Sequence, residues 1–216
     1  MTTMSQTVQV QTLPAEQLKT AAALIADSFR QEGFTRNTLN LSTPARQKRF
    51  ADVGALRLSL GQASGQQLLA ATKGETLAGV AIVKPPMVKA VPWYKLAGAI
   101  VRRAPRLLGM IGDVRWRQGL RIKAAMKPPA TLPTSYYTLD ILGVAPDFQG
   151  QGVGRRLLEH IHVHCDQDEQ AAGIYLYTGD EKNTHIYRRF GYEVVEVTQG
   201  GPLTIWHMFR PRAASV

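Results

Sequence analysis

The sequence predicts an α/β fold, and three patterns carry that prediction. Short apolar or alternating runs typical of strands are interleaved with segments of helical periodicity. Two of the apolar runs are joined by Lys73-Gly74-Glu75, where a glycine can supply the positive φ of a tight hairpin turn. In the C-terminal third, a strand, a glycine-rich turn and an amphipathic helix follow one another. Together these patterns indicate helices packed on a sheet.

The N-terminal half is read as two helices and a hairpin behind a weak first strand. A double proline, Pro85-Pro86, ends the hairpin, because proline cannot continue the ladder. In order, the expected elements are a strand around 8–10, a helical stretch that opens at 13–16 and continues to 29, a second helix after Pro44, and strands over 68–72 and 76–83.

The C-terminal half is read as two helical pieces followed by the clearer α/β pattern. In the helix expected after the glycine-rich turn, Val153, Leu157, Ile161 and Cys165 recur every four residues and should face the core. The expected elements are helices over 93–103 and 106–126, a strand over 136–144, a helix over 152–166, a strand over 174–178, a helix over 183–190, and strands over 192–197 and 203–209.

Composition excludes several classes of protein. The chain has 216 residues, of which 44% are apolar and 19% charged, so it can bury a core and is not read as disordered. The single cysteine, Cys165, excludes an internal disulfide and a cysteine-rich zinc module. The first residues do not resemble a signal peptide, and no apolar run is long enough to span a bilayer. We therefore expect one domain, residues 1–216, in the cytoplasm.

The formal net charge of +10 is concentrated in one segment, residues 84–127. That segment contains eleven basic residues and one acidic residue, whereas the rest of the chain carries fifteen of each. The segment is expected to be a basic helical insertion whose apolar side packs on the protein and whose cations stay in solvent. Contact with nucleic acid or an anionic membrane surface is the alternative interpretation, although no known reader motif supports it.

A glycine-rich turn, Gln149-Gly150-Gln151-Gly152-Val153-Gly154, lies between a predicted strand and a predicted helix. Unpaired amides and the helix dipole make such a place suitable for a phosphate. The dinucleotide motif G-x-G-x-x-G is excluded because Arg155 stands where the third glycine would be, and no P-loop motif occurs. On spacing alone, a phosphate site and a plain helix-capping turn both stay open.

The wider context of this turn resembles a known family. The segment from Leu142 to Leu158 resembles the acyl-CoA signature of the GNAT superfamily of N-acetyltransferases, with Gln149, Gly152 and Gly154 at its [RQ]-x-x-G-x-[GA] core. Downstream, Asn183 and the run Tyr187-Arg188-Arg189-Phe190-Gly191-Tyr192 resemble the family's N…Y-x-x-x-G-[FY] element. The resemblance covers residues 135–210, and its details are most similar to the branch that contains puromycin N-acetyltransferase.

The resemblance implies the GNAT fold, with a central mixed, mostly antiparallel sheet flanked by helices, and the basic insertion between strands three and four. It also implies an acetyl-CoA site in residues 135–210, with the pantetheine arm between two splayed strands and the pyrophosphate on the glycine-rich turn. No metal is expected. The implied binding residues are Leu142, Gly143, Val144, Gln149, Gly150, Gln151, Gly152, Val153, Gly154, Arg155, Asn183 and Tyr187.

Two side chains are candidates for the chemistry. Asp140 is expected to share strand parity with Leu142 and Val144 and to remove the proton of the amine, the alternative being a carboxylate that orders water or binds the ammonium. Tyr187 is expected to protonate the leaving CoA thiolate, the alternative being a packed tyrosine whose hydroxyl bonds the backbone. Asn183 is expected to cap its helix, and it is also a candidate for bonding the pantetheine arm.

The predicted activity is transfer of an acetyl group from acetyl-CoA to a primary amine, by direct attack in a ternary complex. A small-molecule amine is the favoured acceptor, a protein N-terminus or lysine is the first alternative, and a CoA-binding module that docks through the basic insertion is the second. The sequence leaves open whether the chain forms a homodimer. The tract His160-Ile161-His162-Val163-His164-Cys165 is not read as a metal site, because only His160 and His164 share a helix face.

Overall fold

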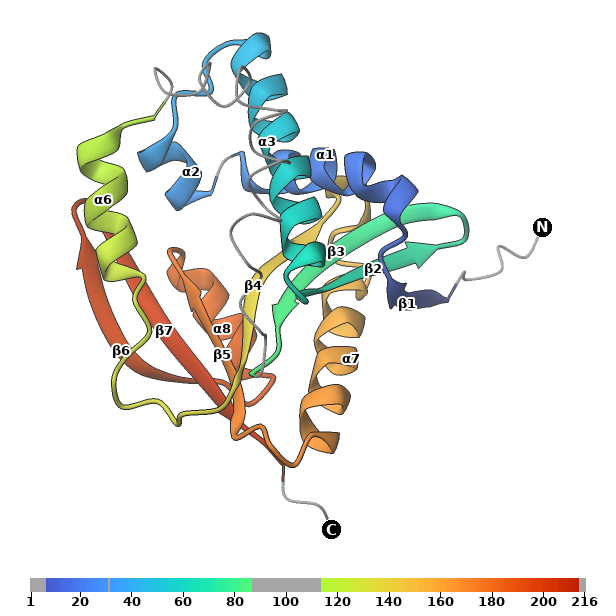
Figure 1. The fold of residues 1–216 in the computed structure, drawn as a ribbon, viewed down its shortest axis with the longest axis vertical. Coiled ribbons are helices and arrows are strands. Elements are labelled where there is room, and N and C mark those ends of the chain that lie inside the picture. The colour runs from blue at the N-terminus through green and yellow to red at the C-terminus, as the bar shows by residue number, and fades with distance from the viewer. Residues whose placement is uncertain (1–6, 31, 87–113, 214–216) are drawn as a thin grey trace.

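The computed structural model describes residues 7–30, 32–86 and 114–213. Its centre is a seven-stranded sheet in the order β1-β2-β3-β4-β5-β7-β6, in which only β4 and β5 are parallel (Figure 1). The fold class predicted from the sequence is therefore confirmed. The strands are β1 (Val8–Thr12), β2 (Gln67–Lys73), β3 (Thr76–Lys84), β4 (Tyr137–Val144), β5 (Gly173–Thr178), β6 (Glu193–Gly200) and β7 (Leu203–Pro211).

Helices cover both faces of the sheet. Helices α1 and α3 lie over β2 and β3 on one face, and α7 lies on the other (Figure 1). None of the helices in the described ranges is long and apolar enough to cross a bilayer. The helices are α1 (Leu18–Phe29), α2 (Gly33–Thr38), α3 (Pro44–Ala63), α6 (Trp116–Ala125), α7 (Val153–Gln167) and α8 (Glu181–Arg188), with short 3-10 turns η1 (Ala15–Gln17) and η3 (Pro146–Phe148).

The larger core lies between α7 and the sheet. The four residues predicted to face it, from Val153 to Cys165 at intervals of four, are all at most 2% exposed. Gly79 of β3 lets the helix approach closely, because a Cβ atom there would stand 2.7 Å from the Cγ1 atom of Val153. The start of α7, which carries the glycine-rich turn, is therefore held tightly against β3 and β4.

Of the basic segment, residues 84–86 and 114–127 are described, and the expected helix over 93–103 lies outside the described residues. The expected helix over 106–126 lies outside the described residues up to 113, and at 114–115 it is wrong, since α6 begins at Trp116. Val114 instead forms an isolated bridge with Leu39, and the amide of Arg115 donates to the carbonyl of Thr38 at 2.9 Å. This pairing with the end of α2 keeps the backbone extended, and helical periodicity alone does not reveal it.

Helix α6 packs on the C-terminal hairpin through Ile122. Its backbone comes close to β6, because a Cβ atom on Gly200 would stand 2.9 Å from the Cα atom of Ile122. The cations in the described part of α6 and its ends, Arg115, Arg117, Arg121, Lys123 and Lys127, are exposed. In this part of the basic segment Ile122 is buried against the protein and the cations are exposed, while Trp116 and Leu120 are exposed as well.

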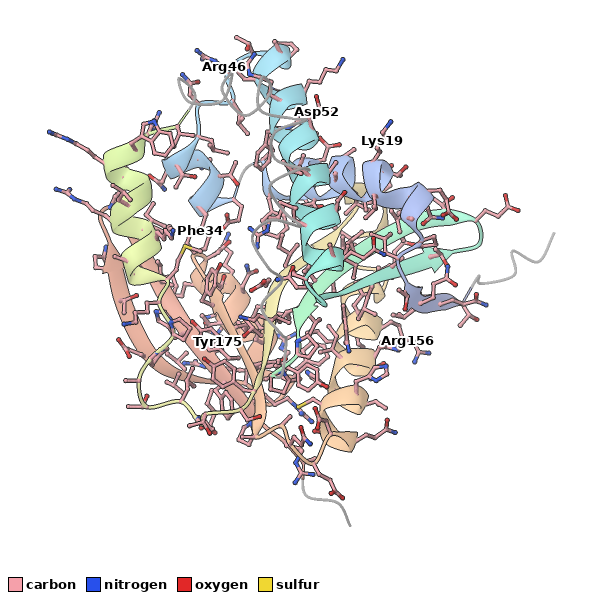
Figure 2. The ribbon with its side chains drawn as sticks, in the orientation of Figure 1. Lys19, Phe34, Arg46, Asp52, Arg156 and Tyr175 are labelled. Carbon is pink, nitrogen blue, oxygen red and sulfur yellow. The ribbon has the colours of Figure 1, made fainter. Side chains whose placement is uncertain are left out.

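A buried polar network fixes the end of α6 to the sheet. The imidazole of His207 is fully buried, with Nδ1 2.7 Å from the hydroxyl of Tyr175 and Nε2 3.0 Å from the carbonyl of Ala125 (Tyr175 is labelled in Figure 2). Burial lowers the pKa of His207, so the ring is neutral. Since the carbonyl can only accept, Nε2 carries the proton and Nδ1 accepts from Tyr175.

We expect Tyr175→Phe to lower the free energy of unfolding by about 1–3 kcal/mol, because it leaves a buried imidazole nitrogen without its donor. Urea denaturation at neutral pH measures the change. Tyr136→Phe is the matched control, because within the described residues the Tyr136 hydroxyl makes no hydrogen bond although its ring packs 5.7 Å from that of Tyr175. Equal losses in the two variants would contradict the assignment.

Candidate active site

Strands β4 and β5 separate soon after they meet. They pair in parallel only at Tyr137↔Ile174 and Thr138↔Tyr175, and beyond these residues they diverge (Figure 1). The rest of β4 is paired on its other side with β3. The edge of β4 that faces β5 is therefore open over its C-terminal half, as the resemblance implied.

The open edge presents backbone groups of Leu142 and Val144. The amide of Ala145 donates to the carbonyl of Ala78 in the direction of β3 at 2.9 Å, and backbone groups alternate in direction along a strand. Those of Leu142 and Val144 consequently point toward the gap, whereas those of Gly143 point toward β3. The Val144 carbonyl already accepts from the Ser28 hydroxyl at 3.1 Å, which leaves its amide and the groups of Leu142 for a ligand.

A β-bulge at Asp140 changes which way the side chains of β4 face. In the pairing with β3, Ile82 lies opposite Ile141 and Val83 lies opposite Leu139, so Asp140 is the extra residue. The expected shared parity of Asp140 with Leu142 and Val144 is therefore wrong. Those two pack against the α7 core, while Asp140 reaches the other face. Its contacts there are Gln66, which precedes β2, and Arg57 of α3.

The glycine-rich turn leads into α7 with its backbone amides accessible. Gly150 and Gly152 have φ values of 73° and 81°, which favour glycine, and a Cβ atom at either would meet nothing within 4 Å. Gly152 is the N-cap of α7, and no side chain caps the helix there. The amides of the first turn, beginning at Val153, lack intrahelical partners and lie at the positive end of the helix dipole.

Side chains around this turn are mostly engaged with one another. Gln151 donates to the carbonyl of Asp147 at 2.7 Å and accepts from the Lys73 ammonium at 2.7 Å. Arg155 is paired with Glu159 along the helix at 2.6 Å. In the glycine-rich turn, the backbone amides are therefore better placed than the side chains to hold a ligand. Lys73 is a further cation at the turn. Because it lies in the β2–β3 hairpin, far from the turn in the sequence, no sequence pattern indicated this position.

Helix α8 carries the next two candidates on the far side of the gap. Its N-cap is Asp180, which accepts from the amide of Lys182 at 3.0 Å, so the expectation that Asn183 caps the helix is wrong. Asn183 lies inside the first turn and donates to the Thr178 hydroxyl at 3.2 Å. This bond aims the side chain at the end of β5, beside the gap.

Tyr187 lies in the last turn of α8 and lines the cavity described below. Its ring packs edge-on against that of Tyr192 at a centroid distance of 5.6 Å. Within the described residues its hydroxyl makes no hydrogen bond. The alternative, a hydroxyl bonded to the backbone, is therefore not observed in these residues. Burial raises the pKa of Tyr187 to about 12, so the phenol keeps its proton at neutral pH.

A cavity of about 290 Å³ occupies the gap between β4 and β5 and continues under α1, α2 and α3. Aromatic and aliphatic side chains form most of its wall. The ring of Phe34, labelled in Figure 2, meets that of Tyr177 edge-on at 5.6 Å. The apolar lining is Ile25, Phe29, Phe34, Leu39, Phe50, Leu58, Ile82, Met126, Leu139, Ile141, Leu142 and Leu176.

Three charged residues line the same cavity: Glu32, Arg57 and Asp140. Asp140 accepts from the Gln66 amide at 3.2 Å, and an Arg57 guanidinium nitrogen lies 3.9 Å from the same oxygen. Burial raises the pKa of Asp140, against the cations of Arg57 and Lys84, which lower it. Asp140 is thus a carboxylate in the cavity wall that has a cation beside it.

Glu32 was missed by sequence reasoning. It is the N-cap of α2, a six-residue helix in a stretch with no clear periodicity. Its Oε2 atom accepts from the amide of Phe34 at 3.0 Å. Burial raises the pKa of Glu32 to about 7, although two backbone amides lower it, and the nearby charge of Asp180 adds to the rise. A glutamate before a helix start is ordinary capping chemistry, so only its burial distinguishes it.

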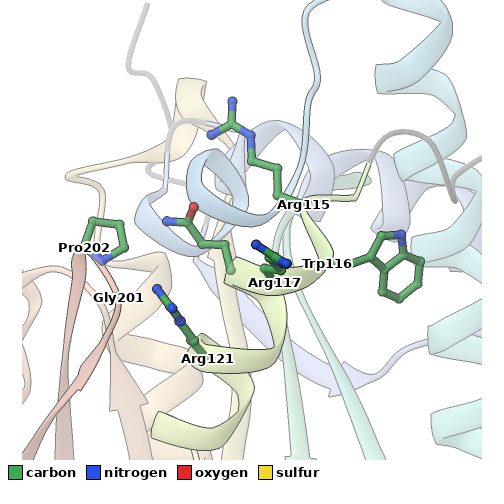
Figure 3. A pocket seen from close by; sticks show the side chains of 7 residues that line it. Arg115, Trp116, Arg117, Arg121, Gly201 and Pro202 are labelled. Atoms are coloured by element: carbon green, nitrogen blue, oxygen red, sulfur yellow. The ribbon is translucent and has the colours of Figure 1, made fainter.

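A second hollow, of about 420 Å³, lies outside this gap, over the start of α6 and the β6–β7 turn. Figure 3 shows Arg115, Arg117 and Arg121 along α6, with Trp116 on the side away from Pro202. All three arginines are exposed. This basic surface is separate from the glycine-rich turn and shares no lining residue with the cavity.

The histidine tract on α7 is divided between two environments. His160 and His164 are neighbours, with their Nε2 atoms 3.2 Å apart. His162 is half-buried against the Tyr192 hydroxyl at 3.2 Å, and burial lowers its pKa to about 4. In the described part of the chain, no three His, Cys, Asp or Glu side chains come together as metal ligands.

Comparison with known proteins agrees with this geometry. Residues 111–194 match the model of the acetyltransferase (GNAT) domain family. A solved structure from Corynebacterium glutamicum, described as histone acetyltransferase HPA2 and related acetyltransferase, superimposes with a TM-score of 0.70 at 15% identity, covering 96% of this chain and 98% of that one. The chain has the GNAT acetyltransferase fold.

Two further relatives give the range of this similarity. The ribosomal-protein-S18-alanine N-acetyltransferase of Escherichia coli has a TM-score of 0.53 at 15% identity and covers 97% of both chains. A mycothiol acetyltransferase of Propionibacterium freudenreichii is 39% identical over 61 residues, which are 28% of this chain. The match spans about one fifth of the length of that curated relative.

Proposed function

We propose that this GNAT-fold protein is an N-acetyltransferase that moves an acetyl group from acetyl-CoA to a primary amine. The observation that supports it most is the coincidence of an open edge on β4 with uncapped amides at the start of α7. The first matches the hydrogen-bonding needs of a pantetheine arm, and the second those of a pyrophosphate. Gln149 to Arg155 would hold the phosphates mainly through their backbone amides.

The reacting groups would meet between these two features. A backbone amide on the open edge would polarise the thioester carbonyl and stabilise the oxyanion of the tetrahedral intermediate. Tyr187 lines the cavity from the opposite side, protonated, and would donate its hydroxyl hydrogen to the departing sulfur. Asn183 stands at the end of β5, where its carbonyl oxygen is available to the arm.

The acceptor is proposed to be a small-molecule amine, attacked directly in a ternary complex. The cavity supports this, since about 290 Å³ is the size of a small ligand site. A protein N-terminus or lysine is the competing acceptor. The resemblance to the puromycin N-acetyltransferase branch supports a small molecule. The curated match is to a mycothiol acetyltransferase, over 28% of this chain.

A panel of amines and peptides, assayed for release of the CoA thiol, tests this proposal. We expect release to depend on both acetyl-CoA and an amine, with acetylated product found by mass spectrometry. Turnover with peptides and with none of the small amines would show that the acceptor is a protein N-terminus or lysine. Binding of acetyl-CoA without turnover on any amine or peptide would contradict the activity.

A further inference from the structure

The two carboxylates of the cavity have different surroundings. Asp140 has a hydrogen bond from Gln66 and the cation of Arg57 beside the same oxygen. The Glu32 carboxylate, in contrast, has no cation within ion-pair distance among the described residues. Its Oε2 atom accepts from the amide of Phe34, and the amide of Thr35 also faces the carboxylate. Glu32 is therefore a half-buried carboxylate of the cavity wall that is held by the backbone and has no paired cation among the described residues.

We propose that Glu32 receives the acceptor ammonium in the cavity and removes its proton. This inference rests on the proposed acetyl transfer, and it assigns the role of the base to Glu32 in place of Asp140. A cationic amine entering an apolar cavity needs an anionic partner to offset its lost hydration. Arg57 already supplies a cation to Asp140, whereas none of the described residues places a cation beside Glu32. The ammonium is thus drawn more strongly to Glu32.

The ammonium gives one proton to the Glu32 carboxylate, and the neutral nitrogen forms a bond with the thioester carbon. The carbon–sulfur bond then breaks, and its electron pair leaves on sulfur. Tyr187 donates a proton to the sulfur, and the second proton lost by nitrogen returns to the Tyr187 oxygen. Glu32 finally releases its proton to solvent, so each turnover yields the acetamide, the CoA thiol and one proton.

The surroundings of Glu32 suit it to this step. Its pKa of about 7 lies close to neutrality, where a general base is most effective. The groups that face it are the amides of Phe34 and Thr35, the charge of Asp180, and the phenol of Tyr177. The charges of Glu32 and Asp140 both raise the pKa of Tyr177. Both carboxylates therefore lie within electrostatic reach of one hydroxyl in the cavity.

The wall of the cavity indicates what the amine is attached to. Beyond its three charged residues the lining is dominated by aromatic rings and aliphatic side chains, including Phe29, Phe34 and Phe50. Such a wall gains free energy by burying apolar surface and loses it by burying a second charge. The acceptor class that fits is a monoamine on an apolar body, such as an aralkyl amine. Polyamines should be poor acceptors.

The pH dependence of kcat/KM tests this assignment, with an aralkyl amine as the acceptor. Wild-type activity should rise to a break near pH 7, where Glu32 ionises, and then stay level up to the pKa of the amine, about 10. Without a base only the neutral amine reacts, so activity would climb steadily to that second pKa. A second aralkyl amine with a different pKa should move the upper break and leave the lower one in place.

Glu32→Gln keeps an oxygen for the Phe34 amide but cannot accept the proton. We expect kcat/KM at pH 7 to fall about 10²-fold, the break near pH 7 to disappear, and acetyl-CoA affinity measured by calorimetry to be unchanged. Asp180→Asn keeps the α8 cap but removes a negative charge beside Glu32, so it should shift the break to lower pH. A purely structural role for Glu32 would produce neither change.

Asp140→Asn is the matched variant, because it neutralises the other carboxylate of the same cavity. Whatever its effect on rate, it should retain the break near pH 7. A break that persists in Glu32→Gln, or that vanishes only in Asp140→Asn, would overturn the inference while leaving acetyl transfer intact. A wild-type protein that acetylates no amine would instead refute the proposed function.

Discussion

Replacing Tyr187 with phenylalanine is expected to lower kcat for acetyl transfer by about 10³-fold and to leave acetyl-CoA affinity nearly unchanged. General acid catalysis contributes about 10²–10⁴-fold, and the loss belongs to kcat because the bond to sulfur matters as the thiolate leaves. The phenol fits that role, since it lines the cavity and its pKa of about 12 keeps it protonated. Steady-state kinetics with the best amine, together with calorimetric titration of acetyl-CoA, gives both quantities.

The control for this variant is Tyr192→Phe. The two tyrosine rings pack against each other at 5.6 Å, but the Tyr192 hydroxyl bonds His162 and does not line the cavity. Its removal should therefore affect stability more than turnover. Similar losses of kcat in both variants would show that the Tyr187 effect comes from packing and that the phenol is not the acid.

Placing a carboxylate on the glycine-rich turn is expected to weaken acetyl-CoA binding strongly. Gly152 is the N-cap of α7 at a φ of 81°, which Asn and Asp tolerate better than other residues, and a Cβ atom there meets nothing within 4 Å. Both side chains should cap the helix. Only Asp adds a negative charge where the pyrophosphate would lie, so Gly152→Asp should bind about 10–100-fold more weakly than Gly152→Asn.

The comparison of these two variants isolates charge from shape, since Asn and Asp are nearly the same size. Affinity for acetyl-CoA is read by calorimetry, and thermal unfolding verifies that both variants fold. The difference should shrink as salt is raised, because the turn is at the surface. Equal affinities at low salt would mean that the phosphates do not rest on this turn.

The sequence predicts well those features that depend on local spacing. The glycine-rich turn, the core face of α7 and the β2–β3 hairpin all follow from patterns within a few residues of one another, and the structure has them. Tyr187 was found through a similar local pattern. Its proposed role depends on contacts with β4 and β5, which only the fold brings to it.

Apart from the N-cap of α8, which is Asp180 and not Asn183, the mispredicted features depend on long-range pairing. The bulge that turns Asp140 toward α3 arises from its register with β3, a strand more than fifty residues earlier in the chain. The start of α6 is set by the bridge between Val114 and Leu39. Glu32 looks like an ordinary helix cap until α2 is seen to close one end of the cavity. Burial of a charge, which gives Glu32 its unusual pKa, is not a property of neighbouring residues in the chain.

Isothermal titration of the full-length chain with acetyl-CoA tests the central claim most directly. If the open edge of β4 and the amides of α7 form a cofactor site, the titration should show saturable binding of one acetyl-CoA per chain, weakened by Gly152→Asp relative to Gly152→Asn. Free CoA should compete for the same site. A wild-type protein that folds normally but takes up no acetyl-CoA would contradict the account.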